Sequence, residues 1–136
     1  MVTLSPPDMH TVQRAPLLSD LPAKELQKLV DVSSVHDYPR GKLLFLRGEP
    51  ATNIYLLLDG WVKVYRDTPD GEQTVIGILR TGETVAEAAI FLGQDYPASA
   101  EVVSPSRLLE IPADFLLNLL RHDSDVAIKM LGTLSQ

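Results

Sequence analysis

The stretch RTGETVAEAAIFLGQDYPASAEV, residues 80–102, carries the strongest structural signal in the chain. It turns at Gly82, passes through a short Ala-rich helical piece over residues 86–92, and returns through Tyr96-Pro97 to an extended segment. The first turn of a helix leaves its backbone N–H groups unpaired, so a helix this short, set between strands, can present donors to an anion. The pattern indicates a ligand cradle inside a β structure.

Short apolar runs separated by turns surround this cradle. Asp59-Gly60 separates two of the runs and predicts a β-hairpin, and Pro69-Asp70-Gly71 predicts a second one. The chain has 8 Gly and 10 Pro, which favours many turns over a helical bundle. The predicted strands cover residues 35–38, 42–46, 53–58, 61–66, 73–79, 99–103 and 107–111. Together with the cradle they give about eight strands, a number typical of an antiparallel barrel or jelly roll.

Apolar residues at helical spacing predict helices at both ends of the β region. One helix follows Pro22 and runs to about Val32, and two more follow Pro112 and Asp123. Residues 1–15 are polar and are expected to form a flexible arm. We therefore expect a single folded domain over residues 16–123.

The last predicted helix, residues 124–136, has no stop signal and has apolar residues on more than one side. A helix of this kind should pack against a partner or against a further segment. We therefore expect the chain to be a fragment of a longer protein. The residues expected at the contact are Val126, Met130, Leu131 and Leu134.

The composition excludes several functions. The net charge of -6 argues against direct contact with nucleic acid, which needs clustered Lys and Arg. The absence of Cys excludes disulfides, thiolate zinc sites, Cys-ligated iron–sulfur clusters and Cys nucleophiles. The sequence has neither a membrane-spanning apolar run nor a signal peptide pattern, so we expect a cytoplasmic protein without a membrane partner.

Three residues of the cradle are candidates for ligand contacts. Gly82 lets the backbone approach a ligand closely, Glu87 has a carboxylate for sugar hydroxyls, and Ser99 has a hydroxyl for a phosphate. A structural explanation is also open: Glu83 and Glu87 stabilise the positive end of a short helix, and Ser99 faces water from an edge strand.

The three histidines, His10, His36 and His122, are isolated candidates for metal or haem ligands. No two of them lie four residues apart or form an H-E-x-x-H pattern. The sequence also lacks a Ser-His-Asp or paired-carboxylate pattern. We therefore predict no enzymatic activity.

Several runs together resemble a known family. They are residues 43–51 (LLFLRGEPA), residues 54–65 (IYLLLDGWVKVY) and residues 82–99, spaced by Gly41, Gly48, Gly60 and Gly82. Over about residues 17–136 the chain resembles the cyclic-nucleotide-binding-type sensor domain of bacterial CRP/FNR-type transcription regulators. The resemblance implies an eight-stranded jelly roll with helices at its ends, and a central helix, beginning here near Ser124, that makes a homodimer. It also implies a helix-turn-helix domain for DNA that lies outside this chain.

The resemblance assigns a phosphate-binding cassette to the stretch quoted above. Its matching positions are Gly82, Glu83, Glu87, Ala98 and Ser99, with Glu87 in the place of the ribose-binding glutamate. Ala86 departs from the cassette because a glycine usually stands there. Tyr96-Pro97 departs because an arginine and its neighbour usually stand there.

The missing arginine is the residue that pairs with the cyclic phosphate in the family. A charge-assisted hydrogen bond of this kind is worth about 1.5–3 kcal/mol. Pro97 also lacks an N–H that could face the phosphate. We therefore expect an effector other than a cyclic nucleotide.

Within the family the chain is similar to the nitric-oxide-responsive denitrification regulators, and this likeness implies haem as a possible cofactor. Three alternatives stay open. The first is cAMP or cGMP binding, with Tyr96 taking the arginine's role. The second is a jelly-roll metal enzyme of the cupin type, and the third is a sensor fold that has lost its ligand and only dimerises.

Overall fold

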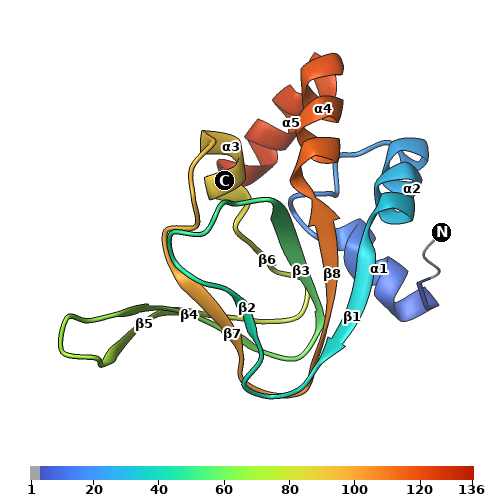
Figure 1. Cartoon of the computed structure of the whole chain (residues 1–136). Helices are drawn as coiled ribbons and strands as arrows, with labels where there is room; N and C mark the ends of the chain where they lie inside the picture. Colours follow the sequence, from blue (N-terminus) through green and yellow to red (C-terminus); the bar gives the residue numbers. More distant parts are fainter. Residues whose placement is uncertain (1–3) are drawn as a thin grey trace.

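The computed structural model describes residues 4–136 as two β-sheets with helices before, between and after the strands (Figure 1). The helices are α1 (Pro6–Arg14), α2 (Ala23–Val32), α3 (Glu87–Leu92), α4 (Ala113–His122) and α5 (Ser124–Leu134). The strands are β1 (Ser34–Tyr38), β2 (Leu43–Phe45), β3 (Asn53–Asp59), β4 (Val62–Asp67), β5 (Gln73–Leu79), β6 (Thr84–Val85), β7 (Ser99–Val102) and β8 (Ser106–Pro112).

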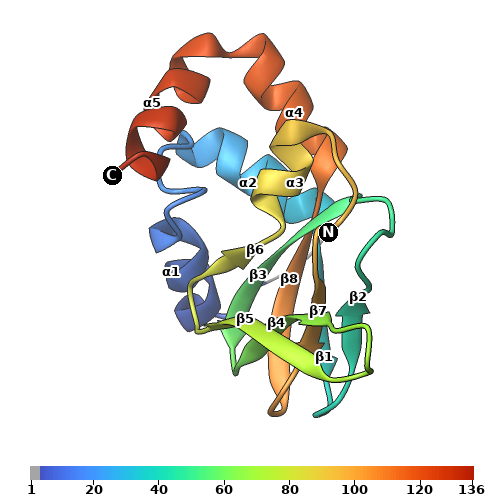
Figure 2. The same cartoon turned by 90° about the vertical axis from the view of Figure 1, so that its left-hand side faces the viewer.

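The strands form two four-stranded sheets, ordered β1-β8-β3-β6 and β2-β7-β4-β5, with every neighbouring pair antiparallel. The sheets face each other, and α1, α2 and α4 contact strands of the first sheet (Figures 1 and 2). This arrangement confirms the predicted mainly β jelly roll with flanking helices.

Strand β3 shows how the sequence builds two cores at once. Ile54, Leu56 and Leu58 belong to the core beneath the helices, and Tyr55 and Leu57 belong to the core between the sheets. All five are buried. Successive strand residues point to opposite faces, so a strand covered on both faces has a continuous apolar run.

The hairpin predicted at Asp59-Gly60 is wrong. A reversal does occur there, but β3 pairs with β8 and β6 while β4 pairs with β5 and β7, so the turn carries the chain from one sheet to the other. Gly60 has φ +117°, and a Cβ on it would lie 2.0 Å from Ser106 Oγ. The turn therefore needs glycine for its conformation and for a close approach to β8. The hairpin predicted at Pro69-Asp70-Gly71 is confirmed by the β4–β5 pairing.

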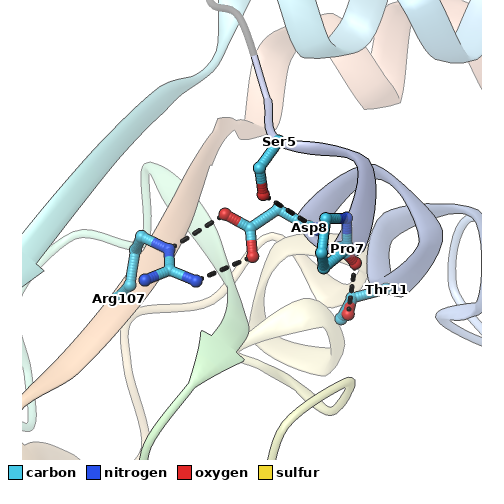
Figure 3. Close-up of polar contacts among 5 residues, drawn as sticks. All are labelled: Ser5, Pro7, Asp8, Thr11 and Arg107. Carbon is cyan, nitrogen blue, oxygen red and sulfur yellow. Dashed lines mark hydrogen bonds and ion pairs between the residues drawn. The ribbon is translucent and has the colours of Figure 1, made fainter.

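The N-terminal segment, expected to be part of a flexible arm, is instead helical over residues 6–14. Ser5 Oγ accepts a hydrogen bond from Asp8 N at 3.3 Å, as an N-cap does. Val12 is fully buried in the helix-side core. Asp8 is also buried and accepts two hydrogen bonds from Arg107 on β8, at 2.9 and 2.8 Å (Figure 3). Local polarity predicted an arm because a partner 99 residues away is invisible to local patterns.

The C-terminal helices begin where the sequence predicts. Asp123 caps α5 by accepting a hydrogen bond from Val126 N at 3.2 Å. Val126 and Met130 are 5% and 2% exposed, whereas Ile128 and Leu131 are 64% and 65% exposed. Helix α5 therefore buries one apolar side within its own chain and leaves another uncovered. Over residues 4–136, no helix is both long enough and apolar enough to cross a membrane.

Candidate functional site

A cavity of about 210 Å³ lies where β6 and α3 face the second sheet. Its walls are Phe45, Val64, Leu79, Thr84, Val85, Ala86, Glu87, Ala88, Ala89, Tyr96, Pro97 and Ala98. Thr84 and Glu87 are the polar members of this set, and none of its members is a Lys, Arg or His. The cavity is therefore an apolar pocket with one carboxylate.

Glu87 is the chemically unusual group of the cavity. Its Oε2 atom is buried and has no hydrogen-bond partner within the described part of the protein. Burial raises the pKa of Glu87, although hydrogen bonds from its own backbone and from Thr84 partly oppose this effect. A buried acceptor without a partner costs free energy, so this oxygen favours a donor supplied from outside the chain.

Ala86 forms the turn that aims α3 across the cavity. It has φ +83° and ψ 0°, and it is the one non-Gly residue with positive φ among residues 4–136. This left-handed conformation brings Cβ close to the backbone of an L-residue and is strained. Ala86, where the resemblance implies a glycine, thus has a conformation typical of glycine and adds a methyl group to the cavity wall.

Tyr96 is a structural residue in this fold. Its ring stacks on Phe45 with centroids 3.9 Å apart. Its hydroxyl donates to Asn53 O at 3.0 Å and accepts from the backbone N–H groups of Thr52 and Asn53, at 3.3 and 3.2 Å. The hydroxyl is thereby saturated and cannot take the role of the missing arginine without losing these bonds.

One cationic side chain that contacts the end of the predicted cassette does not line the cavity. Arg66, on β4, donates from Nε to the carbonyl oxygen of Pro97 at 3.1 Å and is exposed. Pro97 lines the cavity but Arg66 does not. The guanidinium of Arg66 therefore contacts the backbone at the edge of the cavity, and the lining itself has no positive charge.

Three of the predicted cassette residues do not line the cavity. Gly82 and Glu83 shape the preceding turn: Gly82 has φ +91°, and Glu83 Oε1 accepts a hydrogen bond from Arg80 N at 2.9 Å. Ser99 is buried on β7, which lies between β2 and β4, so the alternative of a Ser99 that faces water from an edge strand is wrong; its Oγ accepts from Arg47 N at 2.9 Å. The other five predicted positions, Ala86, Glu87, Tyr96, Pro97 and Ala98, do lie together around the cavity.

The histidines do not fit haem binding in this cavity. His10 on α1, His36 on β1 and His122 at the end of α4 are all exposed, and none lines the cavity. His36 Nε2 lies 3.6 Å from a carboxylate oxygen of Glu110, and His122 Nδ1 lies 2.7 Å from Asn118 O. Among residues 4–136 there is no group of three His, Cys, Asp or Glu side chains suited to a metal ion.

Sequence reasoning missed the part of the cavity that comes from other strands. Phe45, Val64 and Leu79 lie on β2, β4 and β5 and contribute to the cavity lining. The alternation of side chains along a strand shows which residues share one face of that strand. It does not show which sheet the strand joins, so the sequence could not predict that these three residues line one cavity.

Helix α3 connects the cavity to the C-terminal helices. Ala89 lines the cavity and also a second hollow of about 220 Å³ that reaches Ala113 and Leu117 on α4. Phe91 lines an apolar groove of about 250 Å³ with Leu131 and Leu134 of α5. Residues of α3 therefore line hollows on two sides, one at the cavity and one at the C-terminal helices; Figure 2 shows α3 next to α4.

Comparison with known proteins shows where this arrangement recurs. The family model for the cyclic nucleotide-binding domain matches residues 35–123. A "CRP-like cAMP-activated global transcriptional regulator" of Mycobacterium tuberculosis is 27% identical over 74% of this chain and 45% of its own length. A "Global nitrogen regulator" of Synechococcus elongatus is 31% identical over 74% of this chain and 46% of its own length.

Among solved structures, the sensor domain of the transcriptional regulator DNR from Pseudomonas aeruginosa is similar in fold and sequence. It is 32% identical with a TM-score of 0.85, and the match covers 93% of this chain and 85% of that domain. The match thus spans less than half the length of each of these two curated relatives but most of this sensor domain. The proteins named here are regulators.

Proposed function

This chain belongs to the cyclic nucleotide-binding domain family found in CRP/FNR-type transcription regulators, and we propose that it is the effector-sensing part of such a regulator. The observation that carries the proposal is the cavity beneath residues 86–89. Its lining includes five of the eight predicted cassette positions, with the carboxylate of Glu87 among them, and has no cation. The effector is accordingly a small molecule other than cAMP or cGMP.

The proposed mechanism uses α3 as the moving part. A ligand in the cavity contacts Ala86 and Glu87 at the start of α3, while Phe91 near its end contacts the groove of α5. A ligand that fits one position of α3 better than another shifts the equilibrium between two placements of α5. No catalytic step belongs to this proposal.

The partners follow from α5. Ile128, Leu131 and Leu134 are exposed and apolar, which favours a second copy of the chain against this helix. Val126 and Met130, also expected at the dimer contact, pack within their own chain and support α5 from beneath. We propose that a DNA-binding domain outside this chain makes the DNA contacts. A bacterial transcription regulator acts in the cytoplasm, so we propose that location for this chain.

We do not propose haem as a cofactor of this chain. The cavity offers no histidine, and the three histidines of the chain lie on separate elements. An iron–sulfur cluster lacks its ligands because the sequence has no Cys. Binding of cAMP is the second candidate, because the relative from M. tuberculosis is named as cAMP-activated and Glu87 is retained.

Thermal unfolding with added nucleotide tests the proposal. A ligand at 1,000 times its Kd stabilises a protein by about 4 kcal/mol, which moves Tm by many degrees. We expect millimolar cAMP or cGMP to leave the Tm of this chain unchanged. A rise in Tm that saturates at micromolar cAMP would overturn the proposal in favour of the second candidate.

A further inference from the structure

We propose that the cavity takes a small, largely apolar molecule that bears a hydrogen-bond donor or a positive charge, and that Glu87 recognises this donor. The inference rests on the proposed function, because it takes the cavity to be the effector site. It names a class of ligand, and the class follows from three properties of the walls.

The first property is the apolar lining. Phe45 and Tyr96 stack with an interplanar angle of 15° and give the cavity a flat aromatic side. Val64 and Leu79 add aliphatic carbon, and the methyl group of Ala86 adds more. Such a surface favours a planar or aliphatic body that leaves water on entering.

The second property is the vacant acceptor on Glu87. Its buried Oε2 atom has no donor within the described residues, and Glu87 is one of the residues that line the cavity. A ligand with an N–H or O–H group supplies the missing partner, and a cationic donor adds charge attraction. A ligand without a donor leaves this desolvated oxygen unpaired and therefore binds more weakly.

The third property is the charge of the site, which disfavours anions. The lining has a carboxylate and no cation, and Arg66 uses its Nε to hold Pro97 O at the exposed rim. Glu83 and Asp95 lie exposed on the segments that lead into and out of α3, and the whole chain has a net charge of -6. An anionic group of a ligand would meet repulsion from Glu87, and no cationic side chain in the lining would offset it.

Amide NMR spectra of the whole chain test the class with three indoles that share one ring system. The probes are tryptamine, a cation; tryptophol, a neutral donor; and indolepropionate, an anion. We expect tryptamine and tryptophol to shift the amide signals of residues 86–89 and Ala98, with tryptamine bound more tightly. Indolepropionate should leave these signals in place.

Two variants assign the preference to Glu87. Glu87→Gln keeps the shape and removes the charge, so it should weaken tryptamine about tenfold and abolish the preference for it over tryptophol. Glu72→Gln makes the same charge change at an exposed turn outside the cavity and should leave both affinities unchanged. The relative affinities of the three probes for the unaltered chain test the ligand class even if one of the variants does not fold.

Four results would overturn the inference. One is indolepropionate binding as tightly as tryptamine, and another is a Glu87→Gln variant with unchanged tryptamine affinity. Shifts at the cavity with cAMP alone would overturn the ligand class and leave the cavity as an effector site. No cavity shift with any indole or with cAMP would overturn the effector site as well, in favour of a module that only dimerises.

Discussion

Ala86 is the residue at which this chain departs most clearly from unstrained backbone geometry. Its φ of +83° is a conformation that glycine adopts without steric cost, and a residue with a Cβ in this region costs about 1–2 kcal/mol. We therefore expect Ala86→Gly to raise the free energy of unfolding by about 0.5–1 kcal/mol, with part of the gain offset by the entropy of glycine in the unfolded chain. Urea denaturation measures the change, and Ala88→Gly, in the first turn of α3, provides the comparison because a glycine in a helical conformation should destabilise the chain. Equal destabilisation by both variants would contradict this account of the turn.

Glu87 predicts a dependence of stability on pH. Burial raises its pKa above the ordinary 4.5, so the folded state binds a proton that the unfolded state has already lost in the interval above that value. Stability therefore falls as pH rises through the window between the ordinary and the raised pKa, and the loss persists at neutral pH. Glu87→Gln should remove this part of the pH dependence and stabilise the chain at pH 7 by about 0.5–1 kcal/mol, a figure reduced for the partial exposure of the group. Urea midpoints from pH 4 to 8 measure it, and a variant less stable than the parent at pH 7 would contradict the desolvation of Glu87.

At the scale of elements, helix α1 is held to the roll by one buried contact between charged groups. Asp8 accepts both hydrogen bonds from Arg107, and only 7% of Asp8 is exposed (Figure 3). Asp8→Asn removes the charge from a buried acceptor of two charge-assisted hydrogen bonds, so it should cost about 1–3 kcal/mol. Ser5→Ala, which removes only the N-cap hydrogen bond, should cost about 0.5–1 kcal/mol.

Hydrogen exchange distinguishes local opening of α1 from global loss of stability. We expect Asp8→Asn to speed exchange across residues 8–14 before it affects β8. Unchanged exchange in α1 would show that Val12 and its apolar neighbours, rather than the ion pair, hold the helix in place.

The sequence predicted elements better than it predicted their pairing. The β4–β5 hairpin, helix α2 and the starts of α4 and α5 follow from local turn and capping residues, and all are confirmed. Asp59-Gly60 also predicted a turn that the structure contains, but the strands on the two sides of this turn belong to different sheets. Pairing depends on contacts such as Gly60 against Ser106, which join residues far apart in the chain. The same limit explains why the Glu87 side of the cavity was foreseen and the wall of Phe45, Val64 and Leu79 was not.

At the scale of the whole molecule, the uncovered side of α5 predicts self-association. Leu131 is 65% exposed, and Figures 1 and 2 both place α5 at the end of the molecule away from the β4–β5 hairpin. Leu131→Asp should convert a dimer into a monomer without loss of fold, because an exposed charge on one helix opposes burial against a second copy. Light scattering measures the mass, and Val75→Asp, at an exposed position on β5, provides a matched control. A monomeric parent chain at high micromolar concentration would contradict the dimer.

The central claim is that the lack of a cation in the cavity lining keeps cyclic nucleotides out. Calorimetric titration of cAMP into the parent chain, Pro97→Arg and Pro97→Ala tests it most directly, because Pro97 lines the cavity yet is exposed, so Tyr96 keeps its bonds. We predict no binding heat for the parent or for Pro97→Ala, and at least a tenfold gain in cAMP affinity for Pro97→Arg, as one charge-assisted hydrogen bond supplies. Micromolar cAMP binding by the parent chain, or no gain on adding the arginine, would contradict the claim.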